Sequence, residues 1–233
     1  GRVVWVWNPN ATKKNFIRYW WEEENNDQNV LNEMFSQGIQ GLTGEETDNT
    51  SWDALFNYFN EVHGYGEVGY QPGENIAIKV NLNNCYGGYN TIDNNRDASP
   101  YVVKALLNQL VDVVGVNQED IYVYDASRKM QNWFYDRVYN DFPDIHYVDS
   151  DGGASGREKV ISSSEKIYFA DNVVVRTLPT VVTEAKYLIN MPIMKRHPID
   201  WGVTLSGKNF FGTWIEDVSA VHNYHRSGFT NGN

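Results

Sequence analysis

Apolar residues alternate with small or polar residues in several short runs, and this pattern predicts β-strands. The clearest run is 75–82, where Ile76, Ile78 and Val80 point to one face of the expected strand. The other predicted strands are 2–7, 120–125, 145–148, 173–177 and 187–191.

Apolar residues spaced three and four positions apart predict helices between these strands. The helical segments are 29–37, 51–61, 100–114 and 128–140. The helix predicted at 100–114 has clear end signals. Ser99 suits its N-cap, Pro100 its first helical position, and Gly115 its C-terminal stop. This helix lies between two predicted strands, so the three elements form a right-handed crossover unit with parallel strands.

The order of elements predicts an α/β fold with a mainly parallel sheet, flanking helices and Rossmann-like crossover units. We expect residues 1–233 to form one domain, in which 1–74 is an N-terminal strand–helix–helix extension. Gly1 leads directly into an apolar run, which suggests that a leader was removed or left out. No closing element precedes Asn233, so we also expect a truncated C-terminus.

Composition and charge limit the partners of the chain. Its 233 residues include 41% hydrophobic and 21% charged residues, with a formal net charge of −11. The acidic balance argues against DNA, RNA or anionic membranes as main partners, because phosphate attraction supplies most non-specific affinity. No run of about 18 apolar residues is present, so no membrane span is expected.

Cys85 is the only cysteine, which excludes an internal disulfide, a four-cysteine zinc site and a cysteine-ligated iron–sulfur cluster within this chain. The cofactor is otherwise unknown. His222 and His225 are three residues apart and are candidate metal ligands.

Polar side chains follow the predicted strands at their carboxyl ends, where open α/β sheets bind ligands. Lys79 and Asn81 lie on strand 75–82, Asp125 ends strand 120–125, and Asn190 ends strand 187–191. We interpret their coincidence as a ligand site. The alternative is structural: Lys79 and Asp125 form an ion pair, and the asparagines cap turns.

Basic residues gather after Asn190 in an otherwise acidic chain. Lys195, Arg196 and His197 are consecutive, and Lys208 and Asn209 follow about ten residues later. Charge-assisted hydrogen bonds from such groups favour a carboxylate or phosphate. Alternatively, the basic residues form a solvated turn. Gly202 to Lys208 imitates a nucleotide-binding loop, but Asn209 stands where that loop needs Ser or Thr to hold magnesium.

The sequence resembles the domain of unknown function 362 family, in its secreted Bacteroides-type branch. The stretches that carry the resemblance are 76–82, 99–125, Tyr187-Leu188-Ile189-Asn190-Met191-Pro192 through Lys195 and His197, and Thr204 through Lys208-Asn209 to Gly212. The resemblance implies an α/β fold, no settled activity, and export to the periplasm or cell exterior. Some relatives carry ferredoxin-like cysteine clusters, which a chain with Cys85 alone cannot form.

The order of these motifs is also similar to the nickel-dependent lactate racemase family. That similarity implies a cofactor tether at Lys208, a nickel ligand at His222 and acid/base chemistry at His197. The chain lacks the Asp-x-Thr-Arg signature after strand 75–82, and Ala126-Ser127-Arg128 replaces the histidine–arginine motif.

The leading hypothesis is a site for a small anionic ligand at the carboxyl ends of the strands, with or without catalysis. The expected catalytic residues are His197, Lys208 and Asp125, and the expected ligand-binding residues are Lys79, Asn81, Asn190, Lys195 and Asn209. His197 suits a general acid/base because its ordinary pKa lies near neutrality. The alternatives are a metal-dependent racemase-like or isomerase-like enzyme using His197, Lys208 and His222, and a non-catalytic cell-envelope module. That module would bind a glycan or protein through exposed Trp20, Trp21, Trp201 and Trp214.

Overall fold

The computed structural model describes residues 1–169, 174–196 and 206–215. Its contacts divide the chain into two compact units. The first unit contains residues 1–74, 99–120 and 133–144, and the second contains residues 75–98, 121–132 and 145–233.

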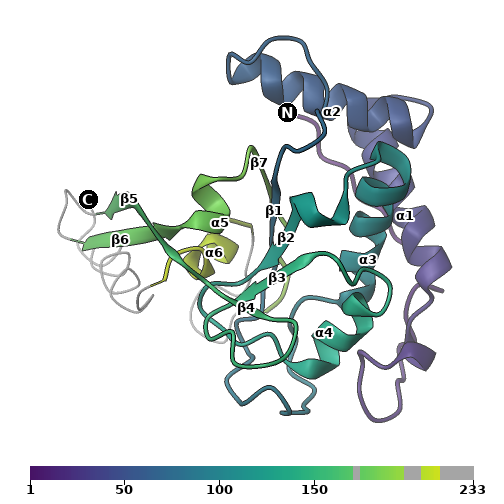
Figure 1. The fold of residues 1–233 in the computed structure, drawn as a ribbon. Helices are drawn as coiled ribbons and strands as arrows, with labels where there is room; N and C mark the ends of the chain where they lie inside the picture. Colours follow the sequence, from purple (N-terminus) through teal and green to yellow (C-terminus); the bar gives the residue numbers. More distant parts are fainter. Residues whose placement is uncertain (170–173, 197–205, 216–233) are drawn as a thin grey trace, which may run out of the picture. The chain divides into compact units, whose positions relative to one another are not determined.

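The second unit contains a five-stranded sheet with the order β4-β3-β2-β1-β7 (Figure 1). These strands are β1 (Ile76–Lys79), β2 (Ile121–Tyr124), β3 (His146–Asp149), β4 (Glu158–Lys159) and β7 (Tyr187–Asn190). Every pairing in this sheet is parallel. The predicted α/β fold is confirmed, because this sheet alternates along the chain with helices.

A separate antiparallel pair, β5 (Ser162–Phe169) and β6 (Val174–Pro179), follows β4 in the chain. The short helices α5 (Thr180–Thr183) and α6 (Ser206–Asn209) and the 3-10 turn η4 (Phe210–Gly212) complete the second unit. Sequence patterning predicted β6 but missed β4 and β5. β4 has only two residues, and β5 carries mostly exposed polar side chains, so neither shows the apolar alternation of a half-buried strand.

The first unit is helical. Its elements are η1 (Glu23–Asn25), α1 (Gln28–Thr43), α2 (Asp48–Val62), α3 (Pro100–Asn108), the π-helical turn η2 (Gln109–Val114), η3 (Gln118–Asp120) and α4 (Asn132–Tyr139), which begins at the unit boundary. Gly115 ends η2 in the left-handed conformation that its position requires, with φ of 81°. Ser99 occupies the N-cap position of α3, as predicted, but its side chain makes no capping hydrogen bond.

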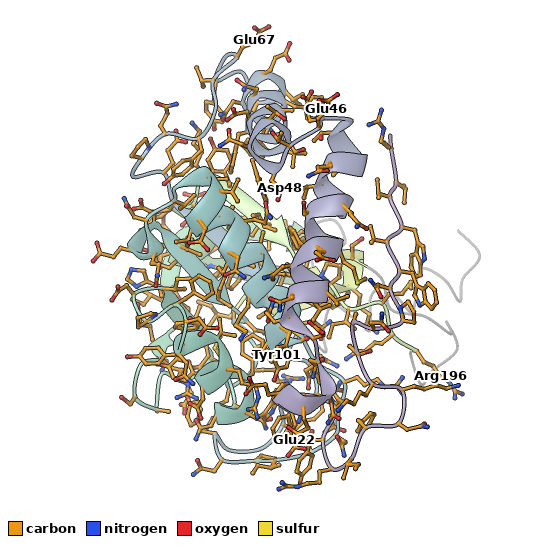
Figure 2. The ribbon with its side chains drawn as sticks, turned by 90° about the vertical axis from the view of Figure 1, so that its right-hand side faces the viewer. Glu22, Glu46, Asp48, Glu67, Tyr101 and Arg196 are labelled. Atoms are coloured by element: carbon orange, nitrogen blue, oxygen red, sulfur yellow. The ribbon has the colours of Figure 1, made fainter. Side chains whose placement is uncertain are left out.

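A polar cluster joins the helices of the first unit. Asp48, at the start of α2 (Figure 2), accepts hydrogen bonds from Gln40 Nε2 and Gln109 Nε2, both at 2.7 Å. Burial alone would raise the pKa of Asp48, but hydrogen bonds from Ser36, Gln109 and Gln40 lower it below its ordinary value. Gln109 Oε1 accepts in turn from Trp52 Nε1 at 3.1 Å. The cluster satisfies its own polar groups and therefore has a structural role.

The predicted strand 2–7 is wrong, because no strand is present there. The segment lies instead along the glycines of α1. A Cβ on Gly41 would lie 3.1 Å from Val4 Cγ1, and Arg2 Nη1 donates to Leu42 O at 3.1 Å. Val3, Trp5 and Trp7 are 93%, 74% and 70% exposed. The close approach to a glycine-bearing helix face replaces the expected pairing with another strand.

No helix among the described residues is long and apolar enough to cross a membrane.

Candidate ligand-binding site

Neighbouring strands of the parallel sheet place three polar residues in one row near their carboxyl ends. Lys79 of β1 pairs in register with Asn190 of β7 and with Tyr124 of β2. Residues in register on adjacent strands point to the same face of a sheet. The row therefore brings Lys79 and Asn190 together, as the sequence predicted, and adds Tyr124.

The Lys79 ammonium is the centre of this cluster. Its side chain is 1% exposed, and Nζ lies 3.1 Å from Asp125 Oδ2. Nζ also donates to Val80 O at 2.6 Å and to Asn209 Oδ1 at 3.5 Å. Burial lowers the pKa of Lys79, although the Asp125 carboxylate opposes that shift. The Lys79–Asp125 ion pair, which the sequence analysis gave as the structural alternative to a ligand site, is thus observed.

Asp125 is held by several donors besides Lys79. Its Oδ2 accepts from Leu82 N at 3.1 Å, and its Oδ1 accepts from Ser127 N at 3.0 Å and from Ser127 Oγ at 2.8 Å. The backbone after β1 and the backbone after β2 therefore both fix this carboxylate. Such a fixed geometry suits a site as well as a structural ion pair.

Asn209 connects the row to the segment 206–214, which covers it. Asn209 Nδ2 donates to Lys79 O at 2.9 Å and to Asn190 Oδ1 at 2.7 Å. Asn190 Nδ2 donates to Ser206 O at 3.1 Å, and Ala126 N donates to Gly212 O at 2.9 Å. These bonds hold 206–214 directly against the buried ion pair.

Gly212 permits this close contact because it has no side chain. A Cβ at this position would lie 2.8 Å from Asp125 Oδ1, 2.9 Å from Lys79 Nζ and 3.0 Å from Ser127 Oγ. Distances this short are not tolerated without movement, so only glycine fits the present geometry.

A second cluster contains Cys85 and Asp97, from the loop after β1, and Lys195, from the segment after β7. Asp97 is 4% exposed, and burial raises its pKa to about 6, although the Asn84 amide and Lys195 oppose that shift. Lys195 Nζ donates to Arg96 O at 2.9 Å, and burial lowers the pKa of Lys195. The charge of Asp125 also raises the pKa of Asp97, which shows that the two clusters are close enough to interact.

Cys85 is not activated as a nucleophile. Its Sγ donates to Asp97 Oδ2 at 3.6 Å, and burial together with the neighbouring carboxylate raises the pKa of the thiol far above its ordinary value. A thiol nucleophile needs the opposite environment, because the thiolate is the reactive form.

The other predicted site residues have different surroundings. Asn81 is buried in the turn after β1, where its Oδ1 accepts from Asn83 N at 3.2 Å. This contact agrees with the structural alternative for Asn81. Lys208 lies in α6 next to Asn209 and is half-buried. His197, His222 and His225 lie outside the described residues, so the proposed acid/base and metal ligands are not placed.

Within residues 1–169, 174–196 and 206–215, no group of three or more His, Cys, Asp or Glu side chains is arranged to hold a metal ion. The proposed tryptophan surface also needs correction, because Trp21 and Trp214 are 5% and 4% exposed and belong to the core. Trp201 is outside the described residues. Trp5 and Trp7 are instead the strongly exposed tryptophans of the described chain.

A hollow lies elsewhere in the second unit, between the sheet and α5. Its lining residues are Asn75, Tyr122, Val148, Glu158, Lys159, Ile161, Thr180, Val181, Glu184 and Ala185. None of the predicted site residues lines it. The Lys79 cluster is buried, because the side chains of Lys79 and Asp125 are 1% and 3% exposed.

Sequence reasoning missed Asp97, Tyr124 and Gly212. Asp97 precedes a helix and resembles a capping residue, and Tyr124 resembles a core residue of its strand. Gly212 could have been found, because it ends the Lys-Asn-x-x-Gly motif that begins at Lys208.

The fold and the site together define an α/β protein with a buried lysine–aspartate–asparagine cluster at the carboxyl ends of its parallel strands. Comparison with protein-family models, with curated proteins and with solved structures finds no match.

Proposed function

We propose that the carboxyl ends of β7, β1 and β2 bind a small anionic ligand, a carboxylate or a phosphate, centred on Lys79. The observation that carries the proposal is the position of the Lys79 ammonium: it is 1% exposed and is contacted by side chains from two other segments of the chain. Coulomb attraction is strong in such surroundings because little water screens it.

An anion can bind the Lys79 ammonium by replacing the weakest of its present contacts. An ammonium has three donors. The contacts to Val80 O and Asp125 are short, whereas the contact to Asn209 Oδ1 is 3.5 Å and weak. An oxygen of the ligand would replace the Asn209 oxygen, and the Asp125 pair would keep Lys79 oriented.

Further positive charge supports the same ligand class. The charge of Arg128 contributes to lowering the pKa of Lys79, so the two cations lie near each other. The Arg128 guanidinium is fixed by Asn83 O, which accepts from Nε at 3.0 Å, and by the Tyr86 ring at 4.7 Å. Lys195 is held on the Asp97 side of the site. The chain as a whole has a formal net charge of −11, so positive charge gathered around this site is a local feature.

If the ligand is a substrate, proton transfer is the chemistry that these residues support. Asp125, Lys208 and His197 keep the proposed catalytic roles. Asp97 joins them because a carboxyl with a pKa of about 6 can exchange a proton near neutral pH. The sequence resemblance supports the further proposals that the chain belongs to the domain of unknown function 362 family and that it is exported.

Calorimetric titration with inorganic phosphate and with acetate tests the proposal. Three variants are compared with the wild type: Lys79→Met, Lys79→Met combined with Asp125→Asn, and the exposed control Lys159→Met. The single variant leaves Asp125 buried without its cation, which is expected to destabilise the fold by about 3 kcal/mol. The double variant removes both charges and is expected to recover much of that loss.

The wild type and Lys159→Met should bind at least one of the anions, and both Lys79 variants should bind it roughly tenfold or more weakly while unfolding cooperatively. The proposal is wrong if the wild type binds neither anion. It is also wrong if the folded double variant binds as tightly as the wild type, because Lys79 and Asp125 would then be a structural pair.

A further inference from the structure

Buried polar atoms without partners lie next to the Lys79 cluster. Tyr124 Oη and Thr213 Oγ1 are buried, and among the described residues neither has a partner that meets hydrogen-bond geometry. The two residues are 0% and 5% exposed. Most buried polar groups in folded proteins are hydrogen-bonded, so this cluster requires an explanation.

These atoms adjoin the proposed ligand site. Tyr124 is in register with Lys79, whose ammonium lies 5.8 Å from the centroid of the Tyr124 ring. Thr213 follows Gly212, which contacts the ion pair directly. Burial raises the pKa of Tyr124, and a side-chain interaction with the Thr213 hydroxyl lowers it in part. The two hydroxyls are therefore neighbours, but their contact does not meet hydrogen-bond geometry, so both remain able to donate to a ligand.

The free energy lost by burying these hydroxyls without hydrogen-bond partners suggests that they take part in binding. A buried polar group without a partner destabilises a fold by about 1–3 kcal/mol. Phe at position 124 and Val at position 213 would have nearly the same shapes and no such cost. The hydroxyls are therefore expected to have a partner in the working state of the protein.

We infer that Tyr124 and Thr213 also bind the ligand, each donating its hydroxyl hydrogen to an oxygen of the anion that Lys79 attracts. This inference rests on the proposed function and extends it from a single ammonium to a site with one charged and two neutral donors. Neutral donors add directional hydrogen bonds without adding charge next to Lys79.

The position of segment 206–214 accounts for the closed geometry. Asn209 and Gly212 hold this segment over the ion pair, and Thr213 is part of it. Displacement of the weak Asn209 contact to Lys79 would open the space between Lys79 and the two hydroxyls. The ligand would then be enclosed by the same segment.

The variants Tyr124→Phe and Thr213→Val test this inference against a matched control, Tyr122→Phe. Tyr122 is on the same strand and face and lies beside His146, with ring centroids 4.4 Å apart. We expect the two hydroxyl variants to unfold at or above the wild-type temperature without ligand. Their dissociation constants for inorganic phosphate or acetate should rise roughly tenfold, while Tyr122→Phe binds like the wild type.

The outcomes separate the inference from the proposed function. If the wild type binds through Lys79 and both hydroxyl variants bind equally well, the inference is wrong and the proposed function stands. If the hydroxyl variants lose stability without ligand and keep their affinity, the hydroxyls are structural and the inference is again wrong. If the wild type shows no Lys79-dependent binding, both are wrong.

Discussion

Asp97 and Lys195 carry opposite charges, yet burial shifts the pKa of each toward its neutral form. The pKa of Asp97 rises to about 6 and that of Lys195 falls. Their mutual attraction opposes both shifts but does not cancel them, because the loss of hydration is the larger effect. The site therefore contains one carboxyl, Asp97, whose pKa of about 6 allows its protonation to change near neutral pH.

Asp97→Asn gives a direct test of this burial effect. The native pKa of about 6 lies above the ordinary value of 3.8, so the native state binds the proton more tightly than the unfolded state. The free energy of unfolding contributed by Asp97 is therefore highest below about pH 4 and falls as the pH rises to about 6. The shift corresponds to about 3 kcal/mol.

Asn at position 97 keeps an acceptor for Asn84 N, which donates at 2.8 Å in the wild type. Urea unfolding should therefore show similar stabilities near pH 4, and Asp97→Asn should be the more stable protein at pH 7. A difference between the two proteins that does not change with pH would contradict the raised pKa.

The segment 206–214 is the element that lies over the Lys79–Asp125 ion pair. It contains one short helix and one 3-10 turn, so its own secondary structure contributes little stability. Its position depends on Asn209 and on the backbone contact of Gly212 with Ala126. A change at either residue should act on this segment more strongly than on the sheet.

Gly212→Ala should destabilise the protein by about 1–3 kcal/mol, because the added methyl group overlaps atoms that cannot easily move. The overlapped atoms are at the ends of side chains, which could normally move away. Here Lys79 and Asp125 are both held in place by other hydrogen bonds. Gly207→Ala is the matched control, since a Cβ there meets nothing within 4 Å. Thermal unfolding of both variants provides the measurement, and equal effects would show that Gly212 does not pack against the ion pair.

At the scale of the whole molecule, local patterning predicted the α/β class and most strands of the parallel sheet. β1, β2, β3 and β7 each carry enough apolar side chains to be recognised. The segment 2–7 is also rich in apolar residues, but it packs against the glycines of α1 and has no partner strand. Pattern alone does not distinguish these two environments.

The candidate site was predictable only in part, for a related reason. Lys79, Asp125 and Asn190 follow strands, and the rule that strands end at a common edge brings them together. Tyr124 and Asp97 become notable only through burial, hydrogen bonding and proximity to residues distant in sequence. A tyrosine in a strand is typical of a core, and an aspartate shortly before a helix is typical of a cap, so neither residue type indicates a site.

Binding of an oxyanion at Lys79 can be tested by anomalous diffraction from crystals grown with selenate. Selenate shares the oxygen arrangement of phosphate, and its selenium atom can be located independently of the protein. We expect an anomalous peak roughly 4 Å from Lys79 Nζ, the spacing that a charge-assisted hydrogen bond to a selenate oxygen produces. Bound selenate only at other positions, or none in crystals saturated with the anion, would contradict it.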